Sequence, residues 1–557
     1  MTACSALLIL TGCTPTASSD EPSTASGSSS APTAQATTAG VTVPDSVTQV
    51  LGASLTPDVS DDDFEWDSSS EVTIALSDTG STGGAGVSVD GSTVTVTKPG
   101  TYRVSGTLSD GQLVVDASGI VRLVLDQAAI TNSRSAALVA NEADKLVIVL
   151  TAGTANTLTD ATEYVYPDAS TTEPDAALFS KVDMVIAGEG KLSVNGRYAD
   201  AIASKDGLVI AGADVTVTAK DDGIRGRDYL VISGGKLAVT SVGQGLKSTN
   251  NADEGAGYIL VSGGTVDVVT TGDKSDCVNS VTNALFTAGT LTLSCTDDAI
   301  HADKLLMVTG GSITVTKSYE GLESAIVDIS GGKLDITSSD DTINANDGSG
   351  GREFGQRPGT TQDNGQGTAP SANPAAPGGT RPGRQPGAGR GAFPTGGTGG
   401  GNPAAGRGGG GESVQNASID VSGGEITVNA GGDGFDSNGT LTISGGTVVA
   451  SGANRAGDGA LDSNGSMQVS GGTLAAIGGA SRMLRIPDET SPQLWFSQEA
   501  AIQAGDTVTI TTNNGTFTFV AAKEAQSIVF SSPDLASGGV SLQVGNGTSI
   551  TPVCHGG

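Results

Sequence analysis

The sequence predicts an all-β fold: a right-handed parallel β-helix with about 22 residues per coil and β caps at both ends. Three observations support this prediction. The 557 residues include 83 Gly and only 3% aromatic residues, which suits short strands and tight turns. A segment of alternating apolar residues around a Gly-Gly pair recurs, as in LVISGGKLAVT from Leu230. A polar residue, a small residue and an apolar residue recur at a step of 22, as from Asp200 to Asp222 and from Asp276 to Asp298.

Each Gly-Gly segment is expected to form two short strands joined by a corner at the glycines. The other segments are ILVSGGTVDVV from Ile259, LMVTGGSITVT from Leu306, VDISGGKLDIT from Val327, IDVSGGEITVN from Ile419, LTISGGTVVAS from Leu441 and MQVSGGTLAAI from Met467. One coil cannot bury its apolar face alone, whereas coils stacked about 4.8 Å apart share a continuous core. A β-propeller needs about 40 residues per blade, so the short step favours the β-helix.

The start of the chain resembles a bacterial lipoprotein signal. Residues 1–13 are apolar and end in Cys13, although no basic residues precede the apolar run. Residues 14–55 are rich in Ser, Thr, Ala and Pro, as expected of a flexible tether. We therefore expect lipidation of Cys13, export, and anchoring on the outer face of the cytoplasmic membrane at the cell surface. The alternative is a chance cysteine after an apolar run.

The repeat pattern divides the rest of the chain. Residues 56–190 are strand-rich but irregular, and we expect them to form an N-terminal cap and the first coils. Regular coils are expected over 191–347 and again over 414–480. Between them, residues 348–413 are rich in Gly, Pro and Arg and predict a disordered insertion, because they have too little apolar surface to bury. Residues 481–557 carry strand signals outside the repeat and predict a C-terminal β cap.

Composition narrows the choice of partners. Asp and Glu number 60 against 28 Lys and Arg, so a net charge of -32 argues against nucleic acid and against anionic membrane surfaces. We expect membrane contact through the lipid anchor only. Cys277 and Cys295 either form a disulfide in an exported protein or remain buried thiols. With two His and no Cys-x-x-Cys motif, a zinc site is not expected.

The repeated polar residues are expected to stack in columns, because residues 22 apart lie above one another on neighbouring coils. The first column contains Asp200, Asp222, Asp276, Asp298 and Asp341, interrupted by Gln244 and Glu320. A second column six residues later contains Asp206, Asp228, Asn250 and Asp347, with Asp303 and Asn464 close to register. Carboxylates stacked about 5 Å apart repel one another by roughly 3 kcal/mol at an effective dielectric constant of about 20.

We therefore expect a cation at these columns. Calcium suits them because it takes about six to eight oxygen ligands from carboxylates, amides and backbone carbonyls. The candidate calcium ligands are Asp221, Asp222, Asp228, Asp276, Asp297, Asp298, Asp303, Asp340 and Asp341. The competing interpretation of any one of them is a solvated Asp-Gly turn, which backbone preferences alone explain.

Several motifs resemble one known family. The motifs are NTLTD (156–160), ALFSKVDMVIAGEGKLSVNG (177–196), IASKDGLVIAG (202–212), VTAKDDGIRGRDYLVISGG (217–235) and SSPDL (531–535). They are similar to the bacterial carbohydrate-binding domain family typified by a Clostridium thermocellum cellulose- and pectin-binding surface protein. The resemblance covers roughly 60–345 and 414–545. It implies a right-handed parallel β-helix related to pectate lyases, bound calcium and polysaccharide binding. The chain departs from the family pattern at Tyr198-Ala199-Asp200, where a His-Gly pair is more usual.

We expect a calcium-binding protein of the cell surface that binds a polysaccharide of plant or bacterial cell-wall type without catalysis. A cellulose-like or pectin-like polymer fits the resemblance, although sparse aromatic residues argue against crystalline cellulose. The candidate sugar contacts are Tyr198, Tyr229, Tyr319, Lys205 and Arg227, since tyrosines can stack on sugar rings. The competing interpretation of any one tyrosine is a plain surface or core role.

Two alternatives stay open. The first is a calcium-dependent, pectate-type polysaccharide lyase, which needs a metal and a basic side chain as proton acceptor. Its candidate bases are Lys205, Lys220, Arg225, Arg227 and Lys247, but these residues could equally neutralise the acidic columns as ion pairs, which we favour. The second is a surface scaffold or adhesin that contacts a protein partner through the Arg-rich insertion.

Overall fold

The computed structural model describes residues 33–35, 50, 56–349, 414–455, 457–480, 484–535 and 539–557. Cys13, the signal segment 1–13, nearly all of the tether and residues 350–413 of the insertion lie outside these ranges, so the predictions made for them are untested. Within the described ranges, no helix is long and apolar enough to cross a membrane.

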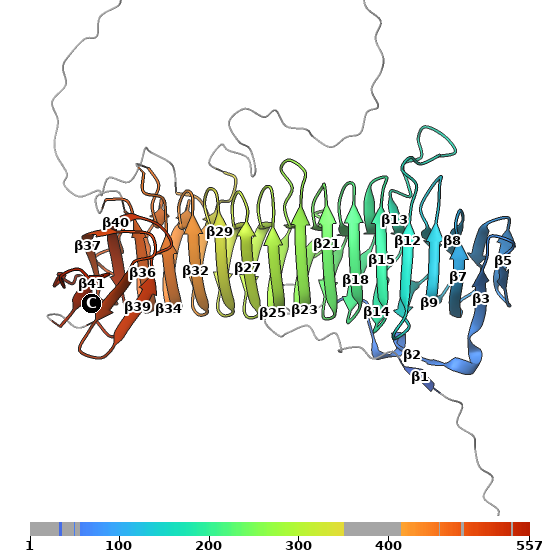
Figure 1. Ribbon diagram of the computed structural model, residues 1–557, viewed down its shortest axis with the longest axis horizontal. Helices are drawn as coiled ribbons and strands as arrows, with labels where there is room; N and C mark the ends of the chain where they lie inside the picture. Colours follow the sequence, from blue (N-terminus) through green and yellow to red (C-terminus); the bar gives the residue numbers. More distant parts are fainter. Residues whose placement is uncertain are drawn as a thin grey trace, which may run out of the picture.

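The predicted parallel β-helix is confirmed. The chain forms an elongated all-β solenoid of about 13 turns (Figure 1). Each regular coil contributes three strand segments, and each segment pairs in parallel with its equivalent on the next coil. The register follows the sequence step of 22: β18 (Asp214–Ala219) pairs with β21 (Lys236–Ser241) so that Asp214 lies opposite Lys236.

The strands form three parallel ladders, and the longer strands bend to join two of them. The first ladder contains β6 (Thr93–Val96), β8 (Gln112–Asp116), β10 (Leu138–Glu142), β13 (Ala176–Ser180), β16 (Asp200–Ser204), β19 (Ile224–Gly226), β22 (Leu246–Ser248), β24 (Val278–Ser280), β26 (Ile300–Val308), β28 (Leu322–Ile329), β30 (Ile343–Ala345), β33 (Phe435–Ser437) and β35 (Leu461–Ser463). The second contains β3 (Val72–Leu76), β7 (Gly100–Leu108), β9 (Ile120–Thr131), β11 (Lys145–Leu150), β14 (Met184–Gly188), β17 (Gly207–Ala211), β20 (Tyr229–Ile232), β23 (Tyr258–Thr270), β25 (Asn283–Ser294), β26, β28, β31 (Ser418–Val421), β34 (Thr440–Ser451) and β36 (Met467–Gly478). The third contains β12 (Ala155–Thr159), β15 (Lys191–Gly196), β18, β21, β27 (Ser312–Lys317), β29 (Lys333–Ser338) and β32 (Glu425–Ala430), with the ends of β7, β9, β23, β25, β34 and β36.

The core runs along the inside of the three ladders. Ile202, Ile224 and Leu246 stack on successive coils of the first ladder and are fully buried. This stacking explains the regular spacing of apolar residues within the repeat, because each β-branched or leucine side chain packs on its equivalents above and below. At the Gly-Gly corner, Gly235 has φ +82, and a Cβ there would lie 2.1 Å from the carbonyl oxygen of Ala213. The corner therefore requires glycine.

The structure joins Cys277 and Cys295 by a disulfide, with their Cα atoms 5.5 Å apart. Both residues lie in the core on neighbouring strand ends, which answers the question that the sequence left open.

Residues 56–70 run along the outside of the second ladder. They include η1 (Asp61–Asp63), β2 (Glu65–Asp67), which pairs with β1 (Thr33–Gln35), and η2 (Ser68–Ser70). Lys145 ties this segment to β11 by contacting Asp63 at 3.0 Å and Asp58 at 2.8 Å. The segment is thus fastened by ion pairs as well as by the buried ring of Phe64.

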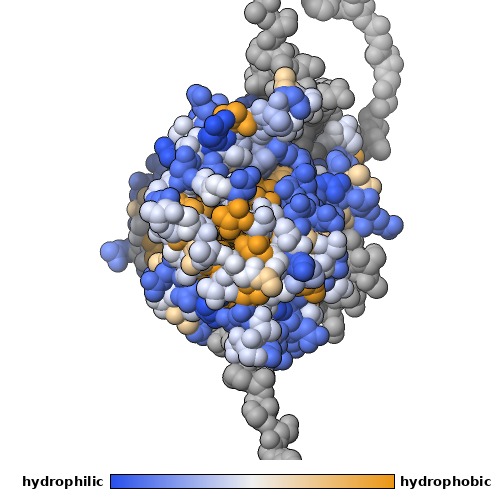
Figure 2. Space-filling model, turned by 90° about the vertical axis from the view of Figure 1, so that its right-hand side faces the viewer, coloured by the Kyte–Doolittle hydropathy of each residue, from blue (hydrophilic) through white to orange (hydrophobic). Residues whose placement is uncertain are grey.

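The two ends of the β-helix differ. Near the N-terminal end, β4 (Thr82–Gly83) and β5 (Val87–Asp90) pair antiparallel with their neighbours, and apolar side chains gather in the middle of that end face (Figure 2). Val89 there is 39% exposed. At the other end, β40 (Ala525–Ser531) pairs antiparallel with β36 and with β37 (Trp495–Ile502).

A separate three-stranded sheet follows in the order β39 (Thr516–Val520), β38 (Thr507–Thr511) and β41 (Ser541–Val544). It shares a hydrophobic cluster with β37 and β40 that includes Phe496 and Phe530. That these end segments serve as caps stays a prediction.

Candidate functional site

The first acidic column forms as a chain of hydrogen bonds between coils. The carboxylate of one column residue accepts the backbone N–H of the column residue on the next coil. These bonds run from Asp222 N to Asp200 Oδ1 (3.1 Å), from Gln244 N to Asp222 Oδ1 (2.9 Å), from Asp298 N to Asp276 Oδ1 (3.0 Å) and from Asp433 N to Asp341 Oδ1 (2.6 Å). The aspartates thus fasten neighbouring coils, and each keeps a second oxygen for another partner.

A second set of side chains, here named the flanking column, lies three residues further along each coil. Its members occupy equivalent outward positions of the first ladder and pair in register. They are Arg225, Lys247, Asn279, His301, Glu323, Asn344, Asp436 and Asp462. Read along the helix, this column passes from basic to acidic. Sequence reasoning did not identify the flanking column as a set. Each of its members is nevertheless the fourth residue of a repeat motif, as in Asp222-Gly-Ile-Arg225.

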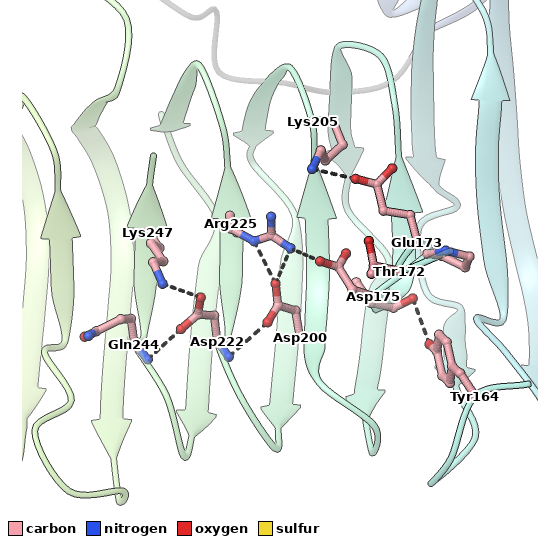
Figure 3. A network of polar contacts seen from close by, with 12 residues as sticks. Tyr164, Thr172, Glu173, Asp175, Asp200, Lys205, Asp222, Arg225, Gln244 and Lys247 are labelled. Carbon is pink, nitrogen blue, oxygen red and sulfur yellow. Dashed lines mark hydrogen bonds and ion pairs between the residues drawn. The ribbon is translucent and has the colours of Figure 1, made fainter. Parts of the chain in front are cut away.

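The basic end of the flanking column neutralises the first column. Arg225 donates from Nε to Asp200 Oδ2 at 2.8 Å and reaches Asp175 Oδ2 at 2.7 Å, while Lys247 Nζ contacts Asp222 Oδ2 at 2.8 Å (Figure 3). Burial raises the pKa of Asp200 to about 7, although the Arg225 charge opposes this shift. The described residues here therefore match the expectation of charge compensation by ion pairs.

A cavity of about 720 Å³ opens over these ion pairs. Its floor contains Arg225 and Lys247, and one wall belongs to the loop of residues 160–175, which joins β12 to β13. Tyr166 and Tyr198 line the cavity. The lining also includes Thr171, Thr172, Asp175, Ala199, Asp200, Asp221, Asp222 and Thr249. Aromatic rings, hydroxyls and charges in one hollow are the usual elements of a site for a polar ligand.

The tyrosine wall is ordered by stacking and hydrogen bonds. The rings of Tyr164 and Tyr198 stack with centroids 4.2 Å apart and planes 16° apart, and Tyr166 meets Tyr198 edge-on. The Tyr164 hydroxyl donates to the carboxylate of the buried Asp160, which also accepts the backbone N–H of Arg197 and so holds the loop on the coil. The loop is thus fixed over the first ladder, and sequence reasoning missed it because it lies outside the repeat.

The predicted sugar contacts do not all lie at the cavity. Tyr198 lines the cavity. Tyr229 does not reach it: its ring is 7% exposed, and its hydroxyl bonds to Asp183 at 2.9 Å on the second ladder. Lys205 pairs with Glu173 of the loop at 2.6 Å, and Arg227 pairs with the adjacent Asp228 at 2.9 Å. Neither Lys205 nor Arg227 lines the cavity, whereas Arg225 and Lys247, which the sequence offered as candidate bases of a lyase, do. That the named residues contact sugar stays a prediction.

Tyr319 is not among the cavity-lining residues either. It is half-buried at a turn, where its backbone N–H donates to the carbonyl of Asp297 and its carbonyl accepts from Asp340 N.

Some of the predicted calcium ligands lie in three groups of acidic or histidine side chains. Others bond instead to a neighbouring polar or basic side chain. In each group the ligand atoms lie within 4.8 Å of one another. The groups are Asp200, Asp221 and Asp222; Asp298, His301 and Glu323; and Asp341, Asp433 and Asp436. Five members of these groups were not among the predicted calcium ligands: Asp200, His301, Glu323, Asp433 and Asp436. Among the others, Asp228 pairs with Arg227 and accepts from Asn250, Asp276 accepts from Asn279, and Asp340 lies 3.9 Å from Arg455.

In the second group, the histidine itself supplies the positive charge. His301 Nδ1 lies 2.9 Å from Glu323 and 3.4 Å from Asp298, and Nε2 lies 3.2 Å from Asp303. Burial opposes protonation, but these three carboxylates raise the pKa of His301 well above its ordinary value. The imidazolium thus takes the place that Arg225 and Lys247 hold nearer the N-terminus.

The third group is different. In the described residues, the Asp341 and Asp433 carboxylates accept hydrogen bonds from the backbone N–H groups of Asp433 and Gly459 respectively. Burial and the neighbouring Asp341 raise the pKa of Asp433 to about 9. This group therefore concentrates carboxyl groups, and in the described residues no basic side chain bonds to Asp341 or Asp433.

Comparison with known proteins finds one similar family. Residues 90–352 match the family model described as carbohydrate-binding domain-containing protein. This part of the chain is similar to that family. A relative of that description from Acetivibrio thermocellus is 40% identical over 136 residues, which are 24% of this chain and 48% of the relative. The chain thus spans about half the length of this relative.

A solved structure described as a polysaccharide lyase-like protein from C. thermocellum, in a gadolinium derivative, is 32% identical with a TM-score of 0.41. The match covers 42% of this chain and 96% of that one. The family resemblance found in the sequence motifs is confirmed by the family model and the 40% identical relative.

Proposed function

We propose that the protein binds a cell-wall polysaccharide in the cavity beside the loop of residues 160–175, and that it does not cleave it. The proposal rests on one combination: Tyr166 and Tyr198 in the same hollow as Arg225 and Lys247. The match of residues 90–352 to a carbohydrate-binding domain family supports a sugar polymer as the ligand.

The lining suits a polymer that carries carboxylates, such as a pectin-like chain of uronates. The tyrosine rings offer apolar faces for the C–H side of a sugar ring, and the threonine hydroxyls can bond to ring hydroxyls. Arg225 presents a planar fork that matches a carboxylate, and the Lys247 side chain is 30% exposed. A neutral glucan would use the rings and hydroxyls but not the two cations.

Binding without catalysis is favoured by the way the two bases are engaged. A lyase needs a base that is free to accept a proton from the sugar. Here Arg225 bonds to two carboxylates and Lys247 to one, so either base would first have to leave its ion pair. A pectate-type lyase remains the second candidate because the same cavity contains acidic residues and bases close together.

We further propose that calcium supports binding. Asp200, Asp221 and Asp222 face the cavity with ligand atoms close enough to share one ion, and Asp221 is exposed there. Calcium at this position would bridge the protein to uronate carboxylates.

Export and a lipid anchor at Cys13 complete the proposal. The disulfide between Cys277 and Cys295 supports an oxidising compartment outside the cytoplasm.

The test is retention of the full chain on immobilised polygalacturonate and on cellulose, with calcium and with chelator. Tyr198→Ala and Lys247→Met should weaken polygalacturonate retention about tenfold each. Lys220→Met is the matched control, because Lys220 is exposed and is not among the cavity-lining residues. Equal retention of all three variants and the wild type would refute the cavity as the binding site.

The same mixtures should be followed by ultraviolet absorbance for unsaturated uronate products. No product is expected. Calcium-dependent product that disappears in Lys247→Met would replace the binding proposal with the lyase.

A further inference from the structure

The outer face of the second ladder carries a continuous row of apolar side chains, here named the outer row. Its members occupy equivalent positions on successive coils and pair in register. They are Val147, Val185, Val209, Val231, Leu260, Leu285 and Met307. Charged residues bound the row, because Arg122 precedes it and Asp328 follows it at the same position. The outer row belongs to a hydrophobic cluster that is separate from the core.

The outer row is buried although its side chains point away from the core. Val231, Leu260 and Leu285 are 0% exposed, and Met307 is 5% exposed. Ile326, which also points outward from this ladder on the next coil, is 39% exposed. Ladder neighbours alone therefore leave an outward side chain partly open to solvent. A further part of the molecule must cover the outer row as far as Met307.

Residues 56–70 cover the beginning of the outer row. Phe64 belongs to the same hydrophobic cluster, and Val59 and Trp66 pack against it. The guanidinium carbon of Arg122 on β9 lies 5.3 Å from the centroid of the Trp66 ring. β2, which contains Trp66, therefore lies over β9, at the N-terminal limit of the row.

The direction of this segment indicates where the residues before it lie. Asp58 N donates to the Tyr229 hydroxyl on β20 at 2.9 Å, and Asp63 contacts Lys145 on β11 at 3.0 Å. From Asp58 onward the chain thus runs toward the N-terminal end of the β-helix. Extended backward in the same direction, the preceding residues would lie over β23, β25 and β26, from which the last three members of the outer row project.

The chain before Asp58 is long enough to reach the end of the outer row and return. β1 pairs antiparallel with β2, so it leads from β9 toward the later coils (Figure 1). Residues 36–55 join β1 to the segment 56–70, and the structure describes Val50 among them. Twenty residues span up to about 66 Å, whereas β26 lies about 34 Å from β9 at about 4.8 Å per coil.

The sequence changes in character within this connection. Residues 14–40 contain no Val, Leu, Ile, Met or aromatic residue. Residues 41–55 read VTVPDSVTQVLGASL, with six Val or Leu residues and a single charged residue, Asp45. Removing such apolar side chains from water is favourable wherever an apolar surface is within reach. The outer row is the surface to which the direction and the length of the chain lead.

We propose that residues 41–55 pack on the outer row from Val231 to Met307 and form, together with residues 56–70, a brace across the second ladder. The ladders join each coil to its neighbours, whereas the brace joins the coils from β9 to β26 along the axis. Residues 41–55 then belong to the folded β-helix and not to the tether. The brace lies on the second ladder, so the inference does not depend on the sugar cavity over the first.

Hydrogen exchange of the full chain, followed by mass spectrometry of its peptides, tests the brace. In the wild type, the amides of residues 41–55 should exchange at least about tenfold more slowly than those of residues 14–32. Val47→Asp/Leu51→Asp should remove this protection, because it would bury two carboxylates on the outer row. Ala25→Asp/Ser29→Asp is the matched control: it adds the same charges at the same spacing outside the brace and should leave the protection unchanged.

A substitution on the outer row itself gives the reciprocal test. Met307→Asp should release residues 41–55 to rapid exchange, although it lies far from them in sequence. Thr442→Asp is the matched control, because Thr442 occupies the same outward position beyond the apolar part of the ladder. Circular dichroism checks that both variants keep the β-helix. If Met307→Asp does not fold, the Val47/Leu51 variant decides, since it leaves every strand unchanged.

Light scattering separates the brace from a second copy of the chain as the occupant of the outer row. A monomer in which residues 41–55 are protected supports the brace. Three results would overturn it. They are rapid exchange of residues 41–55 in the wild type, protection that survives in folded Met307→Asp, and a dimer that Met307→Asp dissociates while Val47→Asp/Leu51→Asp leaves it intact.

Discussion

Replacing Arg225 by methionine should destabilise the protein by an amount that grows with pH. The guanidinium is the cation that faces Asp200, whose side chain is 5% exposed, at 2.7–2.8 Å. Methionine keeps much of the length and volume of the side chain while removing the charge. Asp200 must then either remain charged in an apolar surrounding or take up a proton.

The magnitude follows from the choice between these two states. The pKa of Asp200 is about 7 in the wild type, raised from 3.8 by burial, and loss of Arg225 raises it further. Below about pH 7 the variant can protonate Asp200 at little extra cost, so the penalty should be only about 1 kcal/mol. Above about pH 7 the wild-type carboxylate is ionised and the variant pays up to about 1.4 kcal/mol more per pH unit. The limit is about 3–5 kcal/mol, as found for a buried pair that loses one partner.

The linkage between proton binding and folding gives the sign of this trend. A group whose folded pKa is raised binds more protons in the native state than in the unfolded state, so stability falls as pH rises toward the folded pKa. The fall in stability begins near pH 3.8 in both proteins and continues to a higher pH in the variant.

Urea unfolding followed by circular dichroism, at about pH 6 and about pH 9 in chelator, measures the two penalties. The double variant Asp200→Asn/Arg225→Met is the control and should show a penalty that hardly changes with pH. A penalty for Arg225→Met that is equal at the two pH values, or a control that shows the same slope, would refute the reasoning.

Three further predictions concern the corner, the disulfide and the tyrosines. Gly235→Ala should cost at least about 2 kcal/mol in unfolding free energy, because φ is +82 and the new Cβ would meet a carbonyl oxygen at 2.1 Å; an unchanged urea midpoint would contradict the corner geometry. Replacing both Cys277 and Cys295 by alanine should lower the unfolding free energy by about 3 kcal/mol, since the disulfide closes a loop of 18 residues; equal stability in oxidised wild type and variant would count against a bond in solution. Tyr229→Phe should leave polygalacturonate retention intact because Tyr229 is buried away from the cavity, whereas Tyr198→Ala should reduce it; the reverse order would move the binding surface to the second ladder.

The sequence by itself was sufficient for the fold. The step of 22 appears directly as the strand register, for example where Ile224 faces Leu246, and the Gly-Gly pairs mark the corners. A repeat architecture can be predicted in this way because each coil buries an equivalent apolar face against its neighbours. The same residue types therefore recur at the same positions. The first acidic column was predictable for the same reason.

The site could be predicted only in part. Of the predicted sugar contacts, Tyr198 lines the cavity and Lys205 and Arg227 do not, while Arg225 and Lys247, named only as candidate bases of a lyase, do line it. In sequence these four bases lie equally close to the acidic motifs. Which of them faces the carboxylates depends on the alternation of the short strands β19 and β22, whose middle residues point outward between two buried neighbours.

Only the tertiary structure brought together residues that do not share the repeat. The loop of residues 160–175 is an insertion, so no period predicts that Tyr166 will lie beside Arg225. Asp341 and Asp433 stand 92 residues apart, and they meet because the ladders resume on the same axis after the gap. Local sequence pattern determines what one coil looks like. The contacts between a coil and an inserted loop or a coil distant in sequence depend on long-range stacking, so no local pattern predicts them.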